Sequence, residues 1–247
     1  MFDFLKPANR HKTFEPLVTD MHCHLLPGVD DGSRSLQETI ECLNALAAVG
    51  FQKVCMTPHF QANYPNDEND IQKRFDELKK ILASINDASL PEVVAISGEY
   101  RFDTRFARHP GVDKVLPLPG KRLLCEFSLH FNDFMPHDIF AAYIKDGYTL
   151  ILAHPERYPY LGLHSDEVAK MKEMGILFQV NILSLDGFYG ETALEKGFQY
   201  IESGLTEYLG TDTHNLRYAA ALKEAAANKQ VKKILKKHTF LNASLFD

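Results

Sequence analysis

One short stretch, Asp20-Met21-His22-Cys23-His24, places two histidines on either side of a single residue. On an extended backbone, residues i and i+2 point to the same face, so a strand end with this pattern aims both imidazoles at one point. Neutral imidazole is the commonest metal ligand among side chains. The pattern alone more often marks two histidines on a half-buried strand. The rest of the chain decides between a metal site and that simpler interpretation.

Six further apolar runs follow the first one, and each is predicted to be a strand. The seven predicted strands are 17–22, 53–59, 93–99, 122–126, 148–154, 176–181 and 208–214. Helices are predicted over 35–46, 70–85, 136–145, 166–174 and 191–203, with a helix pair after 214. In the first helix Ser35 and Glu38 form a capping box, and Gly50 ends it. The Lys-rich segment 229–237 is predicted to be a solvated helix face.

Seven such strand-then-helix units favour parallel strands joined by right-handed crossovers. Nearly all strand positions are apolar, as expected where both faces of a sheet are covered. Six of the seven strands end in His, Asp or Glu, and parallel α/β proteins gather functional groups at those carboxyl ends. We therefore predict a closed or nearly closed barrel with a metal-binding mouth. No linker divides residues 1–247, which we predict to form a single domain, with residues 1–16 wrapping its outside.

Composition excludes several classes of protein. The net charge of -6 argues against a dedicated nucleic-acid binder. Four cysteines show no CxxC spacing, so neither a zinc knuckle nor a disulfide framework is expected. The N-terminal segment has no sustained apolar core, and no apolar run approaches the ~20 residues of a membrane span. We predict a cytoplasmic protein without membrane insertion.

The strand ends and the loop after the first strand supply one convergent set of side chains. The predicted metal ligands are His22, His24, Asp31, His59, Glu99, Glu126, His154, Asp212 and His214. Nine ligands exceed what a single tetrahedral zinc ion uses, and they suit two or three ions. Mixed nitrogen and oxygen donors without thiolates favour Mn, Fe or Zn. Clustered ions of this kind support hydrolysis because they activate water and neutralise a leaving oxygen.

Two arginines point to the kind of bond that is hydrolysed. Arg157 lies just beyond one ligand strand and Arg217 just beyond another. A guanidinium group matches the oxygens of a phosphate, so a phosphoester is favoured over an amide or a nucleobase. The alternative for each arginine is a structural pair with a nearby acid such as Glu156. The aromatic residues Phe60, Tyr64 and 188–189 could border the mouth or could simply pack.

An ordered set of motifs over residues 17–217 resembles the PHP (polymerase and histidinol phosphatase) superfamily. Its motifs are His22-x-His24 with Asp30-Asp31-Gly32, Thr57-Pro58-His59, Gly98-Glu99, Cys125-Glu126-Phe127, His154-Pro155-Glu156-Arg157-Tyr158 and Thr211-Asp212-Thr213-His214-Asn215. Within that superfamily, the loop 26–32 and the string 154–158 resemble the bacterial protein-tyrosine phosphatases of capsule and exopolysaccharide operons. The ligand position in this loop is assigned to Asp31, and its neighbour Asp30 is the alternative.

The resemblance implies a distorted (β/α)7 TIM-like barrel with a trinuclear, manganese-preferring site. By this resemblance, one ion is held by His22, His24, Glu99 and Asp212. A second ion shares Glu99 and is held by Glu126 and His154, and a third by Asp31, His59 and His214. Arg157 and Arg217 are then expected to take the phosphate. The implied partner is a cytoplasmic tyrosine kinase with a Tyr-rich tail.

The expected activity is hydrolysis of phosphotyrosine by a metal-activated hydroxide, without a covalent enzyme intermediate. A cysteine-based tyrosine phosphatase needs Cys, five residues and then Arg, and none of the four cysteines has that arginine. A phenolate of pKa about 10 is a tolerable leaving group beside a metal ion. Two alternatives remain open: a phosphatase of histidinol phosphate or another small molecule, and a non-catalytic metal-binding module. The other histidines (11, 109, 130, 137, 164 and 238) are expected to be surface or packing residues.

Overall fold

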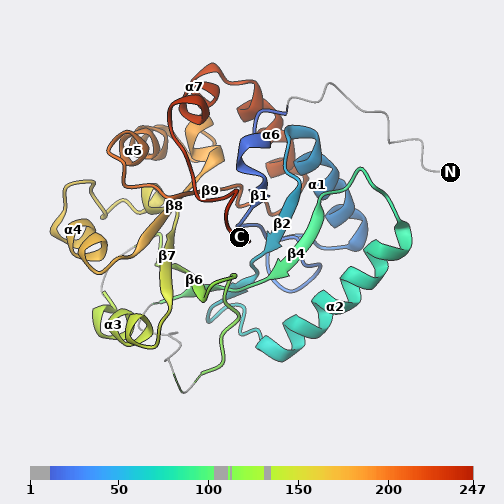
Figure 1. Ribbon diagram of the computed structural model, residues 1–247, viewed down its shortest axis with the longest axis horizontal. Helices are drawn as coiled ribbons and strands as arrows, with labels where there is room; N and C mark the ends of the chain where they lie inside the picture. The colour runs from blue at the N-terminus through green and yellow to red at the C-terminus, as the bar shows by residue number, and fades with distance from the viewer. Residues whose placement is uncertain (1–11, 103–110, 112, 131–134, 247) are drawn as a thin grey trace.

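The computed structural model describes residues 12–102, 111, 113–130 and 135–246, in which strands alternate with helices (Figure 1). The strands are β1 Thr19–Asp20, β2 Lys53–Met56, β3 His59–Phe60, β4 Glu92–Ile96, β5 Glu99–Arg101, β6 Arg122–Glu126, β7 Thr149–Ala153, β8 Leu177–Asn181 and β9 Tyr208–Gly210. The α-helices are α1 Leu36–Val49, α2 Glu68–Ile85, α3 His137–Lys145, α4 Asp166–Glu173, α5 Glu191–Glu202, α6 Leu216–Ala227 and α7 Lys229–Lys237. Short 3-10 helices are η1 Glu15–Leu17, η2 Pro155–Arg157 and η3 Ile182–Asp186.

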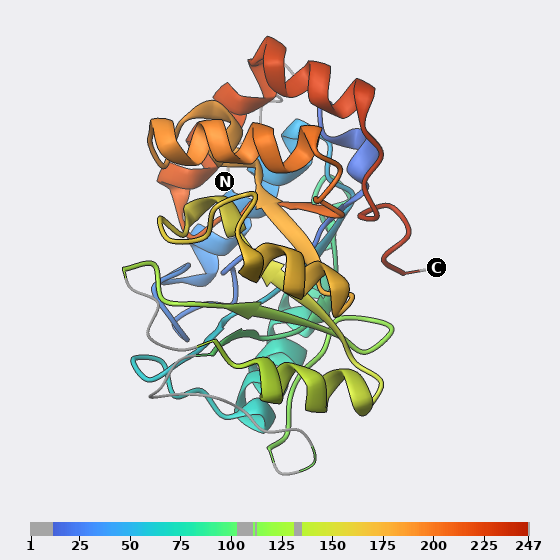
Figure 2. The same cartoon turned by 90° about the vertical axis from the view of Figure 1, so that its left-hand side faces the viewer.

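All paired strands run parallel, in two sheets of order β1-β2-β4 and β3-β5-β6-β7-β8-β9. Only two residues separate β2 from β3 and β4 from β5, so each pair continues one predicted strand. The seven predicted strands are therefore confirmed. The helices lie outside the strands in Figure 1, and Figure 2 shows α5 and α7 on one side of them with α2 and α3 on the other.

Backbone hydrogen bonds bring the first strand of one sheet beside the last strand of the other. The Asp212 N–H donates to the His22 carbonyl at 2.8 Å, and the His24 N–H donates to the Thr213 carbonyl at 2.9 Å. Below them the Asp20 carboxylate accepts the Thr211 hydroxyl at 2.6 Å. The segments after β1 and after β9, far apart in the sequence, thus lie side by side and carry predicted ligands into one place.

Apolar side chains cover both faces of the strands, which explains their nearly uninterrupted hydrophobic sequence. On β6, Leu123 packs with Phe140 of α3 in a large buried cluster. The next residue, Leu124, points the opposite way and joins a second buried cluster with Met21 and Ile151. The alternation follows from the two-residue period of a strand. The strands therefore have one core beneath the helices and another on their inner side.

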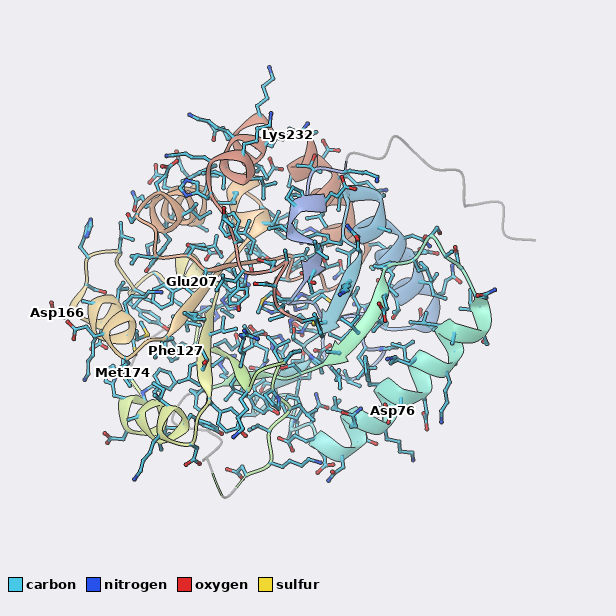
Figure 3. The ribbon with its side chains drawn as sticks, in the orientation of Figure 1. Asp76, Phe127, Asp166, Met174, Glu207 and Lys232 are labelled. Atoms are coloured by element: carbon cyan, nitrogen blue, oxygen red, sulfur yellow. The ribbon has the colours of Figure 1, made fainter. Side chains whose placement is uncertain are left out.

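The outer helices present charge to solvent and apolar residues to the strands. In α7 only Val231 and Ile234 are buried, so the prediction of a solvated Lys-rich face is confirmed. Figure 3 shows Asp76 and Asp166 on the outer sides of α2 and α4. The Ser35 hydroxyl caps α1 by accepting the Glu38 N–H at 3.2 Å, as predicted. Such a cap is worth about 1 kcal/mol.

Two details differ from the expectation. Among the described residues between β5 and β6, no helix is present. Phe14 is completely buried and stacks on Phe51 at 5.6 Å between ring centroids, rather than wrapping the outside. The first eleven residues of that predicted segment lie outside the described chain. Within the described chain, the helices are too short or too polar to cross a membrane.

Candidate metal centre

All nine predicted ligand residues lie at the carboxyl end of a strand or in the segment directly after it. Eight of them are buried, whereas the side chain of Asp31 is 53% exposed. Four overlapping groups each place their donor atoms within 4.8 Å of one another. These groups are His24/His59/His214, His22/His24/Asp212, His22/Glu99/His154 and His59/Glu99/Glu126. Asp31 reaches the same place, because its Oδ1 lies 3.4 Å from His59 Nε2 and 3.9 Å from His214 Nε2.

Glu99 lies at the centre of the cluster. Its Oε1 lies 3.3 Å from His22 Nε2 and 3.0 Å from His154 Nε2. Its Oε2 lies 3.4 Å from His24 Nε2 and 3.0 Å from His59 Nδ1. Each carboxylate oxygen therefore faces two imidazoles from different strands. A carboxylate placed in this way can bridge two cations.

The donor set fits metal ions better than it fits a hydrogen-bond network. Within the described residues, His59 Nδ1, Glu99 Oε2 and Glu126 Oε1 are buried and face one another in the cluster, yet none of the three makes a hydrogen bond of good geometry. Buried polar atoms in native proteins are rarely left unpaired. The Nε2 atoms of His22 and His24 also face each other at 3.2 Å. Cations bound among these nitrogens and oxygens would satisfy the unpaired atoms, and mixed N/O donors without thiolates favour Mn, Fe or Zn.

The backbone is strained at two of the ligand positions. His154 has φ 38° and Asp212 has φ 53°, both in the left-handed region that non-glycine residues seldom adopt. His154 directly follows β7, Asp212 lies two residues beyond the end of β9, and both side chains are buried. Strain of this kind persists where the surrounding structure enforces it, and it concentrates at functional sites.

Fixed acceptors hold the outer nitrogens of three ligand histidines. His22 Nδ1 donates to Gln179 Oε1 at 2.7 Å, and His214 Nδ1 donates to the Asp212 carbonyl at 2.8 Å. His24 Nδ1 pairs with Asp30 Oδ2 at 2.9 Å. A protonated Nδ1 leaves the Nε2 lone pair free to point into the cluster. This contact also distinguishes the two aspartates of the loop. Asp30 supports the ring of His24, whereas Asp31 reaches the cluster directly.

The imidazoles of the site lower the pKa of three carboxyl groups, Asp30, Glu99 and Asp212. Burial by itself raises the pKa of Asp30, but the charge of His24 and its hydrogen bond lower that pKa to about 2. Burial likewise raises the pKa of Asp212, yet the nearby His214 and His22 bring it well below its usual range. Ionised carboxylates gathered in one pocket attract positive ions.

Arg157 contacts the cluster directly. Its Nη1 donates to Asp212 Oδ2 at 2.8 Å, and its guanidinium lies 4.1 Å from the centre of the Tyr189 ring. Arg157 therefore does pair with an acid, as the alternative predicted, but the acid is Asp212 and not Glu156. Arg217 lies over the ring of Phe188 at 4.9 Å. Both predicted arginines thus rest on aromatic rings, but of the two only Arg157 contacts the cluster and lines the cavity above it, whereas Arg217 is exposed.

A cavity of about 180 Å³ opens above the cluster. Its lining includes four residues that sequence analysis did not single out: Gln61, Arg101, Leu129 and Tyr218. Arg101 follows Glu99 by two positions on β5, and its Nη1 donates to Gln61 Oε1 at 2.5 Å. The two-residue period of a strand was the signal that could have indicated Arg101.

The aromatic residues considered for the mouth divide into two groups. Phe60 is fully buried and stacks on Tyr100, so it does not border the cavity. Tyr64 stacks on His59 at 5.8 Å, beside the cluster. Of the six other histidines, His137 pairs with Glu167 at 2.9 Å away from the cluster. The predictions for histidines 11 and 109 fall outside the described residues.

The fold and the cluster together define an α/β protein of parallel strands built to hold metal ions at the strand ends. The chain belongs to the family described as capsular polysaccharide synthesis, CpsB/CapC, whose sequence profile matches residues 18–242. The predicted resemblance to capsule-associated phosphatases is confirmed at the level of this family.

Named relatives cover most of the chain. The tyrosine-protein phosphatase YwqE of Bacillus subtilis is 26% identical over 202 residues, which span 81% of this chain and 78% of the relative. The tyrosine-protein phosphatase CpsB of Streptococcus pneumoniae is 27% identical over 207 residues, spanning 81% of this chain and 84% of the relative.

Solved structures support the fold. A crystal structure from work on YwqE and CpsB, described as unique metal-dependent tyrosine phosphatases, aligns with a TM-score of 0.74 and 24% identity. That alignment covers 92% of this chain and 94% of the other. The phosphotriesterase homology protein of Escherichia coli, complexed with phosphate in its active site, aligns with a TM-score of 0.55 at 13% identity. It covers 94% of this chain and 96% of the other.

Proposed function

We propose that this protein is a metal-dependent protein-tyrosine phosphatase. The observation that carries the proposal is the buried cluster of imidazoles and carboxylates with Arg157 in contact with it. Membership of the CpsB/CapC family, whose named relatives are tyrosine-protein phosphatases, directs the choice of substrate. We further propose that the two parallel sheets form a distorted (β/α)7 barrel of the PHP type and that the chain is a single domain. The hydrogen bonds between the segments after β1 and β9 support the barrel.

The proposed ligand sets use the whole cluster. One ion is held by His22, His24, Glu99 and Asp212, and a second by Glu99, Glu126 and His154. The third is held by Asp31, His59 and His214. The contacts of both Glu99 oxygens support its bridging role. Manganese is the proposed metal, with iron or zinc as alternatives that the same donors accept. When bound, the ions supply an activated water and neutralise the leaving oxygen.

Two arginines of the chain are proposed to position the phosphate group of the substrate. Arg157 and Arg217 are proposed to bind phosphoryl oxygens, because a guanidinium donates two parallel hydrogen bonds to a phosphate. Asp212 holds Arg157 on one side and the Tyr189 ring supports it on the other. Phe188 supports Arg217 in the same manner. The substrate phosphate would therefore meet arginines whose orientation is already restricted.

Aromatic side chains beside these arginines suit a phenyl ring. Phe188 packs against Tyr189 and Tyr218, with ring centroids 5.0 and 4.9 Å away. Tyr218 also lines the cavity. Aromatic pairs in such arrangements gain about 0.5–1.5 kcal/mol. We propose that the ring of phosphotyrosine packs against this patch and that the natural substrate is a tyrosine kinase. The four buried free cysteines support a reducing compartment such as the cytoplasm.

The direct test compares metal-dependent phosphate release by the wild type and His154→Ala. His154 lies 3.0 Å from Glu99, so its loss should abolish release of phosphate from a phosphotyrosine peptide in the presence of Mn²⁺. His137→Ala is the matched control, because His137 pairs with Glu167 away from the cluster. Near-normal turnover by His154→Ala would contradict the proposed role, and wild-type activity that survives full chelation would contradict metal dependence.

A further inference from the structure

β8 is the one predicted strand that does not end in His, Asp or Glu. It ends instead in Gln179-Val180-Asn181, and both amide side chains are completely buried. Residues 179 and 181 share one face of the strand because they are two positions apart. Buried amides need partners for both their donor and their acceptor ends. Their partners turn out to be two ligand residues of the metal centre.

Three consecutive hydrogen bonds connect His22 to Asp212 through these amides. His22 Nδ1 donates to Gln179 Oε1 at 2.7 Å. Gln179 Nε2 donates to Asn181 Oδ1 at 2.8 Å, and Asn181 Nδ2 donates to Asp212 Oδ2 at 2.8 Å. This series of hydrogen bonds begins at the N–H of His22 and ends at the carboxylate of Asp212. Each side chain between them must therefore accept one hydrogen bond and donate another. Primary amides meet that requirement without adding charge.

Gly210 makes room for this chain of amides. It lies on β9 opposite Asn181 in the strand register. A Cβ atom at position 210 would lie 2.8 Å from Gln179 Nε2 and 2.9 Å from the Cβ of His22. Contacts that short force neighbouring atoms to move. The absence of a side chain at Gly210 therefore lets Gln179 reach beneath His22.

The amides fix the inward atoms of both ligands. With Nδ1 bonded to Gln179, His22 presents Nε2 to the cluster. Asp212 Oδ2 accepts from Asn181, Arg157 and Tyr189, which leaves Oδ1 directed inward. His22 Nε2 and Asp212 Oδ1 lie 3.5 Å apart. The distance suits two donors that share one ion.

We propose that Gln179 and Asn181 are positioning residues that hold His22 and Asp212 for a shared metal ion and so determine the affinity of that site. The inference rests on the metal centre proposed above. His24 has a carboxylate, Asp30, behind its ring, whereas His22 has a neutral amide. The amide orients the imidazole without increasing the negative charge of a site that already holds several carboxylates.

The experiment measures Mn²⁺ binding by calorimetry to metal-stripped full-length protein, without any substrate. Gln179→Met keeps the length of the side chain and removes both hydrogen bonds. It should weaken the affinity of the affected ion about 10- to 100-fold, as is typical when a group behind a metal ligand is lost. Asn181→Leu should have a smaller effect, since Asp212 Oδ2 keeps Arg157 and Tyr189. Gly210→Ala should also weaken binding, because the added Cβ would displace both Gln179 and His22.

Asn242 supplies the matched control. It is another completely buried amide, and its Nδ2 donates to the carbonyls of Thr19 and Leu209, away from the cluster. Asn242→Ala should lower Tm and leave the Mn²⁺ affinity of the folded protein unchanged. Gln179→Glu keeps an acceptor for His22 and loses the donor to Asn181. It should therefore bind Mn²⁺ more tightly than Gln179→Met, which a purely structural role of Gln179 does not require.

The outcomes separate this inference from the proposed function. Wild-type affinity in both folded Gln179→Met and folded Gly210→Ala would overturn the inference and leave the phosphatase proposal intact. Metal binding that weakens in these variants, in a protein without phosphatase activity, would support the inference and overturn the proposed function. A wild type that binds none of Mn²⁺, Fe²⁺ and Zn²⁺ would overturn both. If Gln179→Met does not fold, the Mn²⁺ affinities of Gln179→Glu and Gly210→Ala are compared with that of the wild type. Weaker binding by Gly210→Ala than by Gln179→Glu supports the inference, and wild-type affinity in both variants overturns it.

Discussion

At the scale of single residues, neighbouring groups of identical chemistry take different tasks. Asp30 is buried and accepts from the ring of His24 and from the backbone N–H of His59. Asp31 is half exposed and approaches His59 and His214 directly. Adjacent aspartates of one loop thus have different roles: Asp30 supports a proposed ligand, and Asp31 faces the cluster.

Asp30→Ala should weaken Mn²⁺ affinity and phosphatase activity about 10- to 100-fold, because His24 loses the acceptor that fixes its ring. The pKa of Asp30 is lowered to about 2, so its carboxylate is ionised at every pH used for assays. Metal titration and initial rates at neutral pH check the prediction. Asp76→Ala, on the outer side of α2, is the control. Equal metal affinity in Asp30→Ala and the wild type would refute the role of Asp30.

Arg157→Met should reduce activity more than Arg217→Met. Arg157 contacts Asp212, so its loss both removes a phosphate-binding group and frees Asp212 Oδ2 from one of its donors. Arg217 rests on Phe188 and should act chiefly on KM. Steady-state rates on a phosphotyrosine peptide give kcat and KM separately. A larger kcat loss in Arg217→Met would reverse the proposed roles.

Residue patterns and the family resemblance brought the proposed ligands to one cluster, but they did not indicate the groups behind them. His22, His24 and the other ligands were predictable because the resemblance fixes their motifs and strands end where their apolar runs end. Gln179 and Asn181 were missed because amides carry no metal-ligand signal. Arg101 was missed although it lies two positions after Glu99 on β5, where the two-residue repeat of a strand places both side chains on one face. The misses at Gln179 and Asn181 concern contacts between strands that are distant in the sequence, which no local pattern contains.

At the scale of elements, one buried carboxylate ties η2 to β8 and η3. Glu156 Oε1 accepts the N–H of Asn181 at 3.0 Å and the hydroxyl of Ser184 at 2.6 Å. η3 leads directly to Phe188 and Tyr189, the residues that support the two arginines. Glu156 therefore connects the segment after His154 to the aromatic patch.

Glu156→Ala should lower the free energy of unfolding by about 1–3 kcal/mol, because two buried donors lose their acceptor. The exposed Glu195→Ala on α5 should change it by less than about 0.5 kcal/mol. Denaturant unfolding of both variants provides the measurement. If the two variants unfold at the same denaturant concentration, Glu156 does not tie these elements together.

The elements themselves were largely predictable, and their interruptions were not. All seven strands and the helices of the strand-helix units lie where apolar periodicity and capping residues placed them. The breaks at Thr57-Pro58 and Ser97-Gly98 divide two predicted strands and assign their ends to different sheets. Those breaks depend on pairing, for example the Thr57 N–H donating to the Cys23 carbonyl at 2.8 Å.

At the scale of the whole molecule, the metal centre gathers side chains from segments across the chain. The four carboxylates of Asp30, Glu99, Glu126 and Asp212 are buried in this region. Without cations, their mutual repulsion and loss of hydration cost free energy. Bound metal ions should offset that cost and stabilise the folded state. Stability and metal binding are therefore linked through the fold as a whole.

Removing the metal should lower Tm by roughly 5–10 °C. An ion present at 100 times its Kd adds about 2.7 kcal/mol to the folded state. For a protein of this size, 1 kcal/mol corresponds to about 2–4 °C in Tm. Calorimetric scans with chelator, and again after Mn²⁺ is restored, test this expectation. An unchanged Tm in chelator would argue against metal ions that bridge the strands.

The native enzyme should resist thiol alkylation at pH 8. All four cysteines are buried. Burial raises the pKa of Cys42 to about 12, and it also raises the pKa of Cys23, Cys55 and Cys125. The thiolate is the reactive form, so a higher pKa leaves only a small reactive fraction at pH 8. Mass spectrometry and phosphatase assays after iodoacetamide treatment should show unmodified, active protein. Rapid alkylation with loss of activity would point to a catalytic cysteine instead.

The measurement that tests the central claim most directly is the ratio of kcat/KM for a phosphotyrosine peptide to that for histidinol phosphate, with Mn²⁺-loaded full-length protein. A metal centre with an aromatic patch beside its arginines predicts a strong preference for the phosphotyrosine peptide, lost on chelation. Preference for histidinol phosphate would contradict the tyrosine-phosphatase assignment and make the protein a small-molecule phosphatase. A metal-loaded protein inactive on both would contradict phosphoester hydrolysis of either kind.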